Sequence, residues 1–444
     1  RQVLRPPGFV GEVCAWINDQ CRYPRENLAV AAALVAMGDV CGLRHTDDLD
    51  GMSANLFAFC VAGSGTGKEA IMQAATEIHS VAGIQEAVYG AIKSEQEITR
   101  NLVRNQAAFY IYDEFGEFLS KLSSAKNKGG ASYLEGVIGL LMSAYSKANG
   151  SLLITGDMKD EIRDKLKKEL VRCKKEIDNN EDVELNKRME KQLLKSLEQI
   201  KQGIENPFLS LIGFATPELF HSLMTREMVV SGFMGRSLLI TEKETNPRSI
   251  RKFKKRPMDD SMKMFIGELF NGGSYSVHDQ RVEFYGEKHV VQTTEKAAQM
   301  MDKCLDWFED YAENHKENTG LEAIVRRGYE LMGKVSLILA SPEGIRTEEH
   351  VQWAFALIHK DIEEKTRLAF ANEKEKDQPI IALAARILSL VDKDHGASMP
   401  HIKNRLRVNE DIALKAIELL GDKIEAKEVT NQRNGLNTLK YFGV

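Results

Sequence analysis

The sequence predicts an α/β fold in which parallel strands alternate with helices. Three short, almost wholly apolar segments support this prediction: Leu56–Gly63, Ala107–Tyr112 and Leu209–Thr216. Apolar runs of this length, without polar alternation, are typical of strands buried on both faces of a parallel sheet. Stretches with helical character separate the three runs, and strands that alternate with helices indicate a layered α/β domain.

The segments on either side of these strands complete the predicted core. Residues 1–50 are expected to form an N-terminal helical segment, in which the run Asn27–Cys41 is rich in alanine, a strong helix former. The core itself is expected at residues 51–245 and includes a further strand at Ser237–Thr241. We therefore expect helices to lead into the sheet from its N-terminal side.

Residues 157–206 interrupt the core and have a different character. Apolar residues recur at spacings of three and four on both sides of the polar loop Asp178–Asp182, which predicts an inserted antiparallel helical hairpin. The segment carries 13 Lys/Arg and 13 Asp/Glu, so it is highly charged but neutral overall. Two interpretations remain open: an arm that touches DNA or a partner, and an outward spacer.

Two further regions are expected after the core. Residues 246–375 combine a basic linker, around Arg251–Arg256, with a helical, lid-like domain. The linker either contacts phosphate groups or is simply solvated. Residues 378–444 contain helices followed by two strands around an Asn-Gly turn, which is typical of a winged helix. Winged helices bind DNA or dock proteins, and the sequence leaves both open.

Length and composition limit the class of protein. A chain of 444 residues predicts two to four domains, and 43% hydrophobic with 28% charged residues is typical of a globular protein. No apolar run reaches about 18 residues, so we expect no membrane span. The six cysteines are scattered without zinc-ligand spacing. The net charge of −5 argues against tight wrapping by nucleic acid but leaves a narrow basic channel open. The chain opens with Arg1 and shows no signal pattern, so we expect a cytoplasmic location.

A glycine-rich segment follows the first predicted strand and opens a helix, which is the context that a phosphate-binding loop requires. Glycines let consecutive backbone N–H groups point at phosphate oxygens, and the helix N-terminus adds the positive end of its dipole. Lys68 supplies a mobile positive charge. The predicted ATP-binding residues are Gly63, Ser64, Gly65, Thr66, Gly67, Lys68 and Glu69. The predicted fold is therefore a P-loop NTPase core of AAA+/RecA-like type, with a helical lid, the inserted hairpin and a C-terminal winged helix.

Two residues depart from the usual GxxxxGK[ST] pattern. Ala62 stands at the first glycine position, and Glu69 stands where a Ser or Thr usually binds magnesium. A carboxylate close to phosphate is repelled unless a magnesium ion or water lies between them. We therefore expect Glu69 to lie near Mg²⁺. The ending Gly-Thr-Gly-Lys-Glu resembles that of bacterial enhancer-binding transcription activators, which are active AAA+ ATPases, so Glu69 is compatible with hydrolysis.

A second motif stands 45 residues after Lys68, where the strand Ala107–Tyr112 ends in Asp113 and Glu114. Taken alone, an acidic pair at the end of a strand indicates helix capping or a surface turn. With a phosphate loop upstream in the right order, the pair predicts a nucleotide site instead. Asp113 is then the expected magnesium ligand, and Glu114 is the expected catalytic residue that polarises water for attack on the γ-phosphate.

Two more positions complete the predicted catalytic set. Thr216 ends the strand Leu209–Thr216, where it either contacts the γ-phosphate or the attacking water as a sensor, or caps the helix that starts at Pro217. Arg236 precedes the strand Ser237–Thr241. It is either an ordinary surface arginine or an arginine finger that reaches into the site of a neighbouring subunit.

These motifs, in this order, resemble a family of phage, prophage and mobile-element ATPases known as domain of unknown function 3987. The resemblance covers residues 7–365 and also rests on the segments Asn27–Leu34, Ser94–Ile98, Phe214–Phe220 and Gly232–Ile240. The resemblance implies that the chain hydrolyses ATP in connection with replication, and members of this family often follow a primase. The motif order is also similar to that of superfamily 3 and related AAA+ helicases, in which an insertion between the acidic strand and the sensor strand faces the pore of a ring.

The sequence and the resemblance together lead to two hypotheses. The first is a ring-forming, hexameric helicase or translocase that acts on single-stranded or forked DNA of a phage or mobile element, uses ATP and Mg²⁺, and works with a primase or another replication partner. The second is an AAA+-type ATP-dependent switch, such as a replication initiator, loader or regulator, that binds DNA or protein without unwinding. An interface between subunits is the expected catalytic unit in the first hypothesis.

Overall fold

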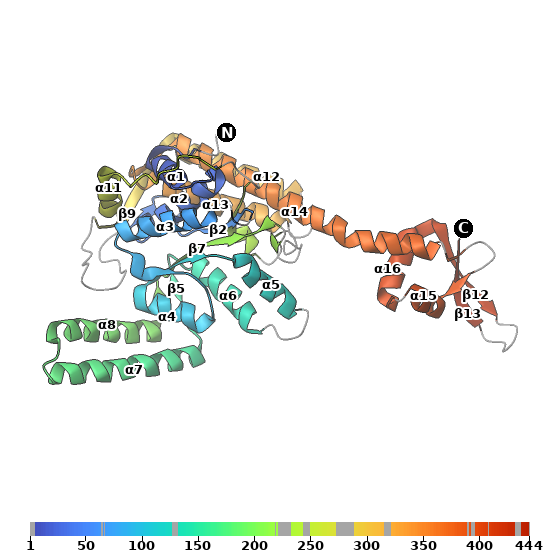
Figure 1. The fold of residues 1–444 in the computed structure, drawn as a ribbon, viewed down its shortest axis with the longest axis horizontal. Coiled ribbons are helices and arrows are strands. Elements are labelled where there is room, and N and C mark those ends of the chain that lie inside the picture. The colour runs from blue at the N-terminus through green and yellow to red at the C-terminus, as the bar shows by residue number, and fades with distance from the viewer. Residues whose placement is uncertain are drawn as a thin grey trace. The chain divides into compact units, whose positions relative to one another are not determined.

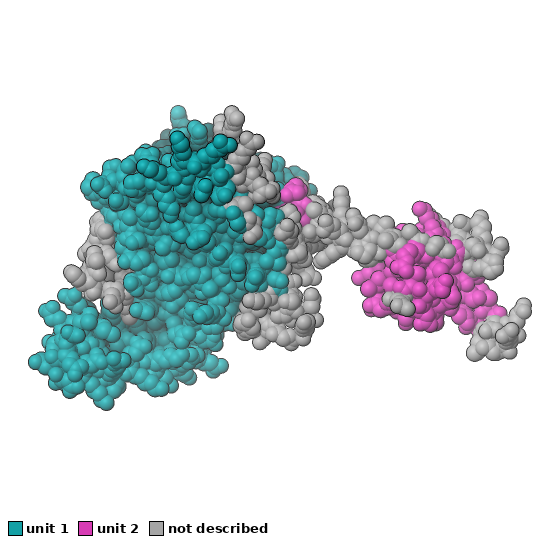
Figure 2. All heavy atoms as spheres, in the orientation of Figure 1, with its two compact units in different colours: residues 1–366 teal, residues 367–444 magenta. Residues whose placement is uncertain are grey.

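The structure is a computed structural model that describes residues 5–63, 65, 67–126, 132–217, 219–220, 232–242, 249–271, 288–314, 321–388, 390–391, 396–406, 408–430 and 437–443. The chain divides into two compact units, residues 1–366 and residues 367–444 (Figure 2). Among the described residues, no helix has both the length and the apolar composition needed to cross a bilayer.

A five-stranded parallel sheet forms the centre of the first unit. Its strand order is β3-β4-β7-β2-β8, and every neighbouring pair is parallel. The strands are β2 (Phe57–Val61), β3 (Val88–Tyr89), β4 (Ala107–Tyr112), β7 (Phe208–Ala215) and β8 (Ser237–Thr241). All residues of β2 and β7 are buried, as expected for apolar strands covered on both faces. The predicted α/β fold with a parallel sheet is confirmed.

Helices cover both faces of this sheet (Figure 1). Helix α2 (Glu26–Gly42) is buried along almost its whole length, because its alanine-rich sequence is apolar on every side, and it packs on β2, β7 and β8. Helices α1 (Gly8–Asp19), α3 (Lys68–Val81) and α13 (Leu321–Ala340) pack around α2. The opposite face carries α4 (Glu95–Asn105), α5 (Phe115–Lys126) and α6 (Ser132–Ser146). A 3-10 turn η2 (Gln85–Ala87) precedes β3.

The segment between α6 and β7 forms two long helices that lie side by side in opposite directions (Figure 1). They are α7 (Gly156–Asp178) and α8 (Val183–Gln202). At their base, strands β5 (Ser151–Leu152) and β6 (Ile204–Glu205) pair antiparallel. Between the helices, the Cys173 thiol donates to the carbonyl oxygen of Asn186 at 2.8 Å. The charged residues therefore stay on the surface while a narrow seam of buried residues joins the two helices.

The rest of the first unit forms a second, smaller sheet with its helices. The parallel strands are β1 (His45–Asp47), β9 (His289–Thr293) and β10 (Ile345–Arg346), and the helices are α11 (Asp260–Asn271), α12 (Glu295–Asn314) and the first part of α14 (Glu348–Leu388). Helix α14 provides hydrogen-bond partners for backbone groups on the free edge of β8. Asp361 accepts the Leu239 N–H at 2.6 Å, and Lys365 donates to the Ser237 carbonyl. These contacts cover an edge that would otherwise expose unpaired backbone groups.

The second unit has its own small core. It contains the end of α14, then β11 (Ala397–Ser398), α15 (Met399–Leu406), α16 (Glu410–Leu420), the 3-10 turn η5 (Gly421–Lys423), β12 (Ile424–Thr430) and β13 (Asn437–Gly443). The strands form an antiparallel sheet in the order β11-β13-β12. Ile387, Ile402 and Tyr441 are among the buried residues that join the helices to this sheet. The predicted Asn-Gly turn lies outside the described residues.

Candidate functional site

Three of the predicted motifs follow neighbouring strands at one edge of the central sheet. Strand β7 lies between β4 and β2, with Tyr112 paired to Gly213 and Val61 paired to Ala215. The segments that follow β2, β4 and β7 therefore leave the sheet at nearly the same level. They carry the glycine-rich loop, the acidic pair and Thr216, which the structure thus brings together.

The connections of β2 and β7 run in opposite directions from this edge. The chain leaves β2 for β3 at one side of the sheet, and it leaves β7 for β8 at the other side. In open parallel sheets, ligands bind in a crevice outside the carboxyl ends of the strands, at a point where the strand order reverses. The topology alone therefore points to the glycine-rich loop after β2 as a binding place.

The glycine-rich loop has the backbone that a turn into a helix N-terminus needs. Gly65 and Gly67 have φ values of +69° and +96°, in the left-handed region that favours glycine. Gly67 is the N-cap of α3, and Lys68 is the first residue of that 14-residue helix. Free backbone N–H groups in the first turn of a helix attract anions. Two of the predicted binding residues, Ser64 and Thr66, lie outside the described residues.

Tyr23 lies beside this loop and was not predicted as a site residue. A Cβ atom at position 67 would lie 3.4 Å from the Tyr23 carbonyl oxygen and 3.5 Å from its Cβ. Tyr23 belongs to the connection between α1 and α2, more than 40 residues before the loop, and no local pattern links the two. A side chain at position 67 would therefore be disfavoured by the φ of +96°, while its Cβ would be in ordinary contact with Tyr23.

Glu69, the unusual residue of the loop motif, is exposed at the start of α3. One of its carboxylate oxygens accepts a hydrogen bond from the Gln73 side chain at 3.0 Å, and Gln73 in turn accepts one from Lys255 at 3.1 Å. Glu69 also lines an open cavity with Met72 and Tyr89, at the end of β3. Its other carboxylate oxygen is the one left for a metal or water.

The acidic pair after β4 occupies a strained turn. Glu114 has a φ of +53°, which is uncommon for a residue with a side chain. Its N–H donates to Asp113 Oδ1 at 2.9 Å, and its carbonyl accepts the Glu117 N–H at 2.9 Å as α5 begins. Both acidic side chains are exposed. The turn thus places two carboxylates at the same end of the sheet as the glycine-rich loop, with the end of β7 between them.

Phe115 holds this turn in place. Its buried ring stacks on Phe59 of β2, with 4.9 Å between centroids and 17° between planes, and it also stacks on Phe118. The ring lies against the backbone of Gly213 in β7, where a Cβ would come within 2.6 Å of Phe115 Cγ. Packing across three strands therefore fixes the residue that follows Glu114. The sequence shows each of these residues but not their contact.

Thr216 follows β7 and begins a helical turn. Its carbonyl oxygen accepts the Phe220 N–H at 2.9 Å, and the residue is half-buried. Across the sheet, the N–H of Ala62 donates to the carbonyl of Ala215 at 3.1 Å. Thr216 therefore stands beside the first residues of the glycine-rich loop, in a position that suits both predicted roles, the sensor and the helix start.

Arg236 lies at the opposite end of the strands, where β8 begins. It ends the 3-10 turn η3 (Met234–Arg236), and the next residue, Ser237, pairs with Phe57 at the start of β2. The glycine-rich loop begins six residues later along β2, which corresponds to roughly 20 Å of strand. Arg236 therefore does not reach the loop of its own chain. Its guanidinium donates to the Gly232 carbonyl at 3.0 Å and to Ser146 Oγ at 3.3 Å.

A buried lysine, Lys334, contacts the segment that leads into β2, at the same end of the strands as Arg236. Lys334 on α13 donates to Asn55 Oδ1 at 2.6 Å and to the Ser53 carbonyl at 3.1 Å, and its ammonium lies 4.5 Å from the centre of the Tyr145 ring. Burial lowers the pKa of Lys334 to about 8. Asn55 continues the network, because its amide donates to the Tyr145 carbonyl at 3.1 Å. The network joins α13 to the segment that leads into β2.

A Ser, His and Asp cluster lies in the core behind the site. Asp39 on α2 contacts His79 Nε2 at 2.7 Å and accepts a hydrogen bond from Ser210 Oγ. The carboxylate stands between the other two groups, and all three are buried, so the arrangement differs from that of a hydrolase triad, in which His lies between Ser and Asp. The cluster joins α2, α3 and β7, and it therefore stabilises the helix that the glycine-rich loop opens.

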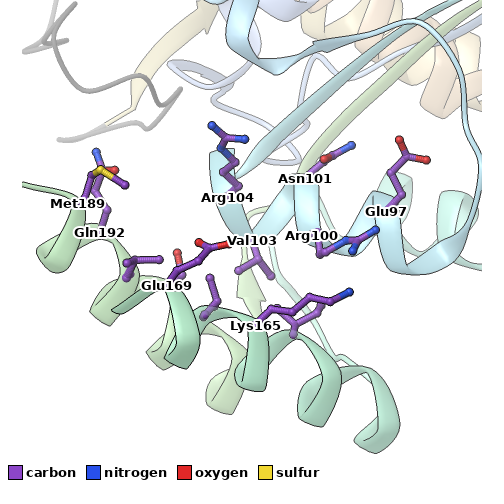
Figure 3. A pocket seen from close by; sticks show the side chains of 13 residues that line it. Glu97, Arg100, Asn101, Val103, Arg104, Lys165, Glu169, Met189 and Gln192 are labelled. Carbon is purple, nitrogen blue, oxygen red and sulfur yellow. The ribbon is translucent and has the colours of Figure 1, made fainter. Parts of the chain in front are cut away.

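A separate cavity lies between α4 and the α7–α8 pair. Its volume is about 610 Å³, and Figure 3 shows side chains of both helix groups that line it. Arg100 and Arg104 come from α4, and Lys165 and Glu169 come from α7. Acidic and basic groups are mixed on its walls. None of the 13 residues that line it is a predicted site residue, so the cavity is distinct from the strand-end site.

The described residues contain no group of three or more His, Cys, Asp or Glu that could hold a metal by itself. Magnesium beside a nucleotide needs fewer protein ligands, because it is commonly bound by one or two carboxylates together with phosphates and water. Asp113 fits this requirement: it is exposed at the sheet edge, and only Oδ1 is engaged with the Glu114 N–H. No protein-family model matches the chain, and no curated protein matches it either.

Proposed function

We propose that the chain is a P-loop ATPase of AAA+/RecA-like type that works as a ring-forming helicase or translocase on single-stranded or forked DNA. One observation carries the proposal: the strand order β4-β7-β2 puts the glycine-rich loop, the acidic pair and Thr216 at the same edge of a parallel sheet. Each of these motifs is weak when taken alone. Their convergence at the place where parallel sheets bind ligands supports a common nucleotide site.

Each residue has a distinct role in the proposed site. The backbone between Gly63 and Lys68 would hold the β-phosphate, with the N-terminus of α3 and the Lys68 ammonium adding positive charge. Asp113, assisted through water by Glu69, would hold Mg²⁺, which when bound neutralises charge on the phosphate oxygens. Glu114 would orient and polarise the attacking water. The turn that Phe115 holds in place would position this carboxylate for that role.

Arg236 supports assembly into a ring. Because it lies at the opposite end of the strands, it is useful for catalysis only in the site of an adjacent copy. An arginine supplied from outside a site stabilises charge in the transition state of phosphoryl transfer. A ring, with the hexamer as the form we favour, gives every site such a neighbour. The same segments carry the resemblance to mobile-element ATPases, which suggests DNA as the track and a primase or replication protein as a partner.

The second unit fits a winged helix within this proposal. It combines three helices with an antiparallel sheet in which the long strands β12 and β13 pair over seven residues each. In winged helices that bind DNA, the helix before the strands enters a groove and the strand pair contacts the backbone. The same shape also docks proteins, so this unit is assigned either to DNA or to a replication partner.

The proposal is tested by measuring ATP turnover with Mg²⁺ in the absence of DNA and with single-stranded, duplex and forked DNA. We expect single strands to raise turnover and a labelled strand to be displaced from forked DNA. Glu114→Gln should lower turnover by on the order of a hundredfold or more while ATP still binds. The exposed Glu117→Gln, on the same helix turn, is the matched control and should behave as wild type. Stimulation without displacement would favour the ATP-dependent switch, and absence of hydrolysis would refute both.

A further inference from the structure

The segment between β8 and α11 carries a concentrated positive charge. Residues 249–258 contain five Lys or Arg and no Asp or Glu, in a chain whose net charge is −5. All five cations are exposed, and the segment has no helix or strand. We call residues 250–256 the basic strap. A polybasic segment in an acidic protein is either a solvated loop or a polyanion site, and the contacts of its backbone decide between the two.

The backbone of the basic strap is held at both ends. At its start, the Ile250 N–H donates to the Arg22 carbonyl at 2.9 Å. At its end, the Arg256 carbonyl accepts hydrogen bonds from Trp16 Nε1 at 3.3 Å and Gln20 Nε2 at 2.7 Å. Both donor side chains come from α1 or the residue that ends it, more than 230 residues away. These contacts fix the path of the strap's backbone against α1 and the segment that follows it.

The charges of the basic strap are unequally neutralised. Arg256 has two acidic neighbours, Asp259 at 2.9 Å and Asp19 at 3.7 Å, and Lys255 donates to Gln73 on α3. Among the described residues, Arg251, Lys252 and Lys254 form no ion pair and no side-chain hydrogen bond. Arg22, which the strap contacts through its backbone, is also exposed and without an acidic partner in the described part of the chain. Four exposed cations thus lie on two segments, distant in sequence, that a backbone hydrogen bond joins.

We propose that the basic strap, together with Arg22, binds the phosphate backbone of a single nucleic-acid strand. Phosphate oxygens are the natural partners of exposed Lys and Arg, and several cations spread along a fixed backbone match a polyanion better than they match one triphosphate. Holding the backbone in advance lowers the entropic cost of binding. The proposal rests on the proposed function in its choice of nucleic acid as the ligand, and it names where on the chain the strand lies.

The surface adjoins the proposed ATP site. Arg22 is followed by Tyr23, which lies against Gly67, and Lys255 bonds to Gln73, which bonds to Glu69. A strand bound to the strap would therefore contact the same elements that carry the glycine-rich loop. This arrangement couples the occupancy of the strand site to the position of α3, which is what stimulation of ATP turnover by nucleic acid requires.

The test measures binding of a fluorescein-labelled oligothymidylate of about 20 nucleotides by fluorescence anisotropy, without nucleotide and over a range of salt concentrations. The full chain is compared with a variant that combines Arg251→Ala, Lys252→Ala and Lys254→Ala. Lys255 and Arg256 are left unchanged because they contact α3 and α1. The matched control combines Lys147→Ala, Lys296→Ala and Lys303→Ala, three exposed lysines outside the strap and outside the α7–α8 pair that form no ion pair in the described part of the chain.

We expect the strap variant to lose affinity by on the order of ten- to a hundredfold at about 0.1 M salt, and the slope of log K against log salt to fall by roughly 2. The control should bind as wild type, and both variants should keep wild-type turnover of ATP measured without nucleic acid. An unchanged affinity of the strap variant, or an equal loss in the control, would overturn the proposal. So would weakened ATP binding by the strap variant, because the strap would then belong to the nucleotide site.

The two proposals fail separately in this design. Binding is measured without ATP, so a chain that binds the oligonucleotide through the strap but never hydrolyses ATP refutes the proposed function and leaves the strap. A chain that hydrolyses ATP but binds the oligonucleotide equally well without the strap cations refutes the strap proposal and leaves the proposed function. An oligouridylate arm repeats the measurement with the same phosphate chemistry, and equal dependence on the strap is expected there, because no base is read.

Discussion

The ring of Phe115 packs directly on the backbone of Gly213, so closely that a Cβ atom at position 213 would lie 2.6 Å from the ring. Phe115 follows Glu114, whose φ of +53° gives the acidic turn its shape. The absence of a side chain on β7 therefore sets the position of a proposed catalytic residue on the neighbouring connection. This contact makes the site sensitive to a change that touches no charged group.

Gly213→Ala should displace Phe115 and with it the turn at Glu114. We expect the free energy of unfolding to fall by about 1–3 kcal/mol, because the added methyl overpacks a buried contact. ATP turnover should fall on the order of a hundredfold, since a displacement of about 1 Å is costly for catalysis. Chemical denaturation and steady-state turnover measure the two effects. Gly139→Ala on α6, where an added Cβ meets nothing within 4 Å, is the control and should be neutral or stabilising. A Gly213→Ala protein as stable as wild type would contradict the packing argument.

Arg236→Ala should abolish turnover without loss of ATP binding if the residue acts in a neighbouring copy. Removing an arginine finger costs roughly a thousandfold or more in turnover. The decisive measurement mixes Arg236→Ala with Glu114→Gln, each inactive alone. In a mixed ring, some sites combine an intact Glu114 with an intact Arg236, and part of the activity should return.

Arg326→Ala is the control for this mixing experiment, because Arg326 is exposed on α13 and lies 3.8 Å from Glu313 in a surface ion pair. It should leave turnover unchanged. Mixtures of Arg236→Ala and Glu114→Gln that are no more active than the sum of their parts would show that Arg236 does not act between copies.

The unfolding free energy of the wild type should rise with pH in the alkaline range, and a variant without Lys334 should lack this rise. Burial lowers the pKa of Lys334 from 10.5 to about 8. Between these two pH values the lysine is neutral in the folded chain but protonated in the unfolded chain, so unfolding takes up a proton and becomes harder as pH rises. Relative to Lys334→Met, the wild type should gain up to about 3 kcal/mol of unfolding free energy between pH 8 and 10.5. Below pH 8 the difference between the two should be constant.

Denaturant titrations at a series of pH values measure this gain. Lys303→Met, at an exposed position on α12, is the control and should keep the wild-type gain. An identical pH dependence of Lys334→Met and wild type would mean that Lys334 stays protonated in the folded chain throughout this range.

Much of the fold follows from local sequence. The three apolar runs predicted strands because a segment buried on both faces has no polar alternation, and they correspond to β2, β4 and β7. The sheet order was not predicted, because the order depends on which strands pair across long sequence separations. The contact between Asp361 and the Leu239 N–H has the same origin: its partners are 122 residues apart, and nothing near either residue indicates the other.

The candidate site was likewise predictable from the sequence only in part. Gly67, Lys68, Asp113 and Glu114 are recognisable because their chemistry lies in short motifs with a fixed spacing from a strand end. Tyr23 and Gly213 are not, since their importance comes only from what packs against them in space. The anchoring of the basic strap by Trp16 and Gln20 is likewise visible only in the structure, although its charges are plain in the sequence.

The proposed ATP site depends above all on Lys68, which stands at the start of α3 and would bind the phosphates of ATP. The most direct test compares ATP turnover by the wild-type chain and Lys68→Ala at saturating ATP and Mg²⁺, with equal folding checked by circular dichroism. We expect turnover by the wild-type chain and its loss in Lys68→Ala, with weaker binding of a fluorescent ATP analogue. Turnover retained by Lys68→Ala would show that Lys68 does not bind the phosphates.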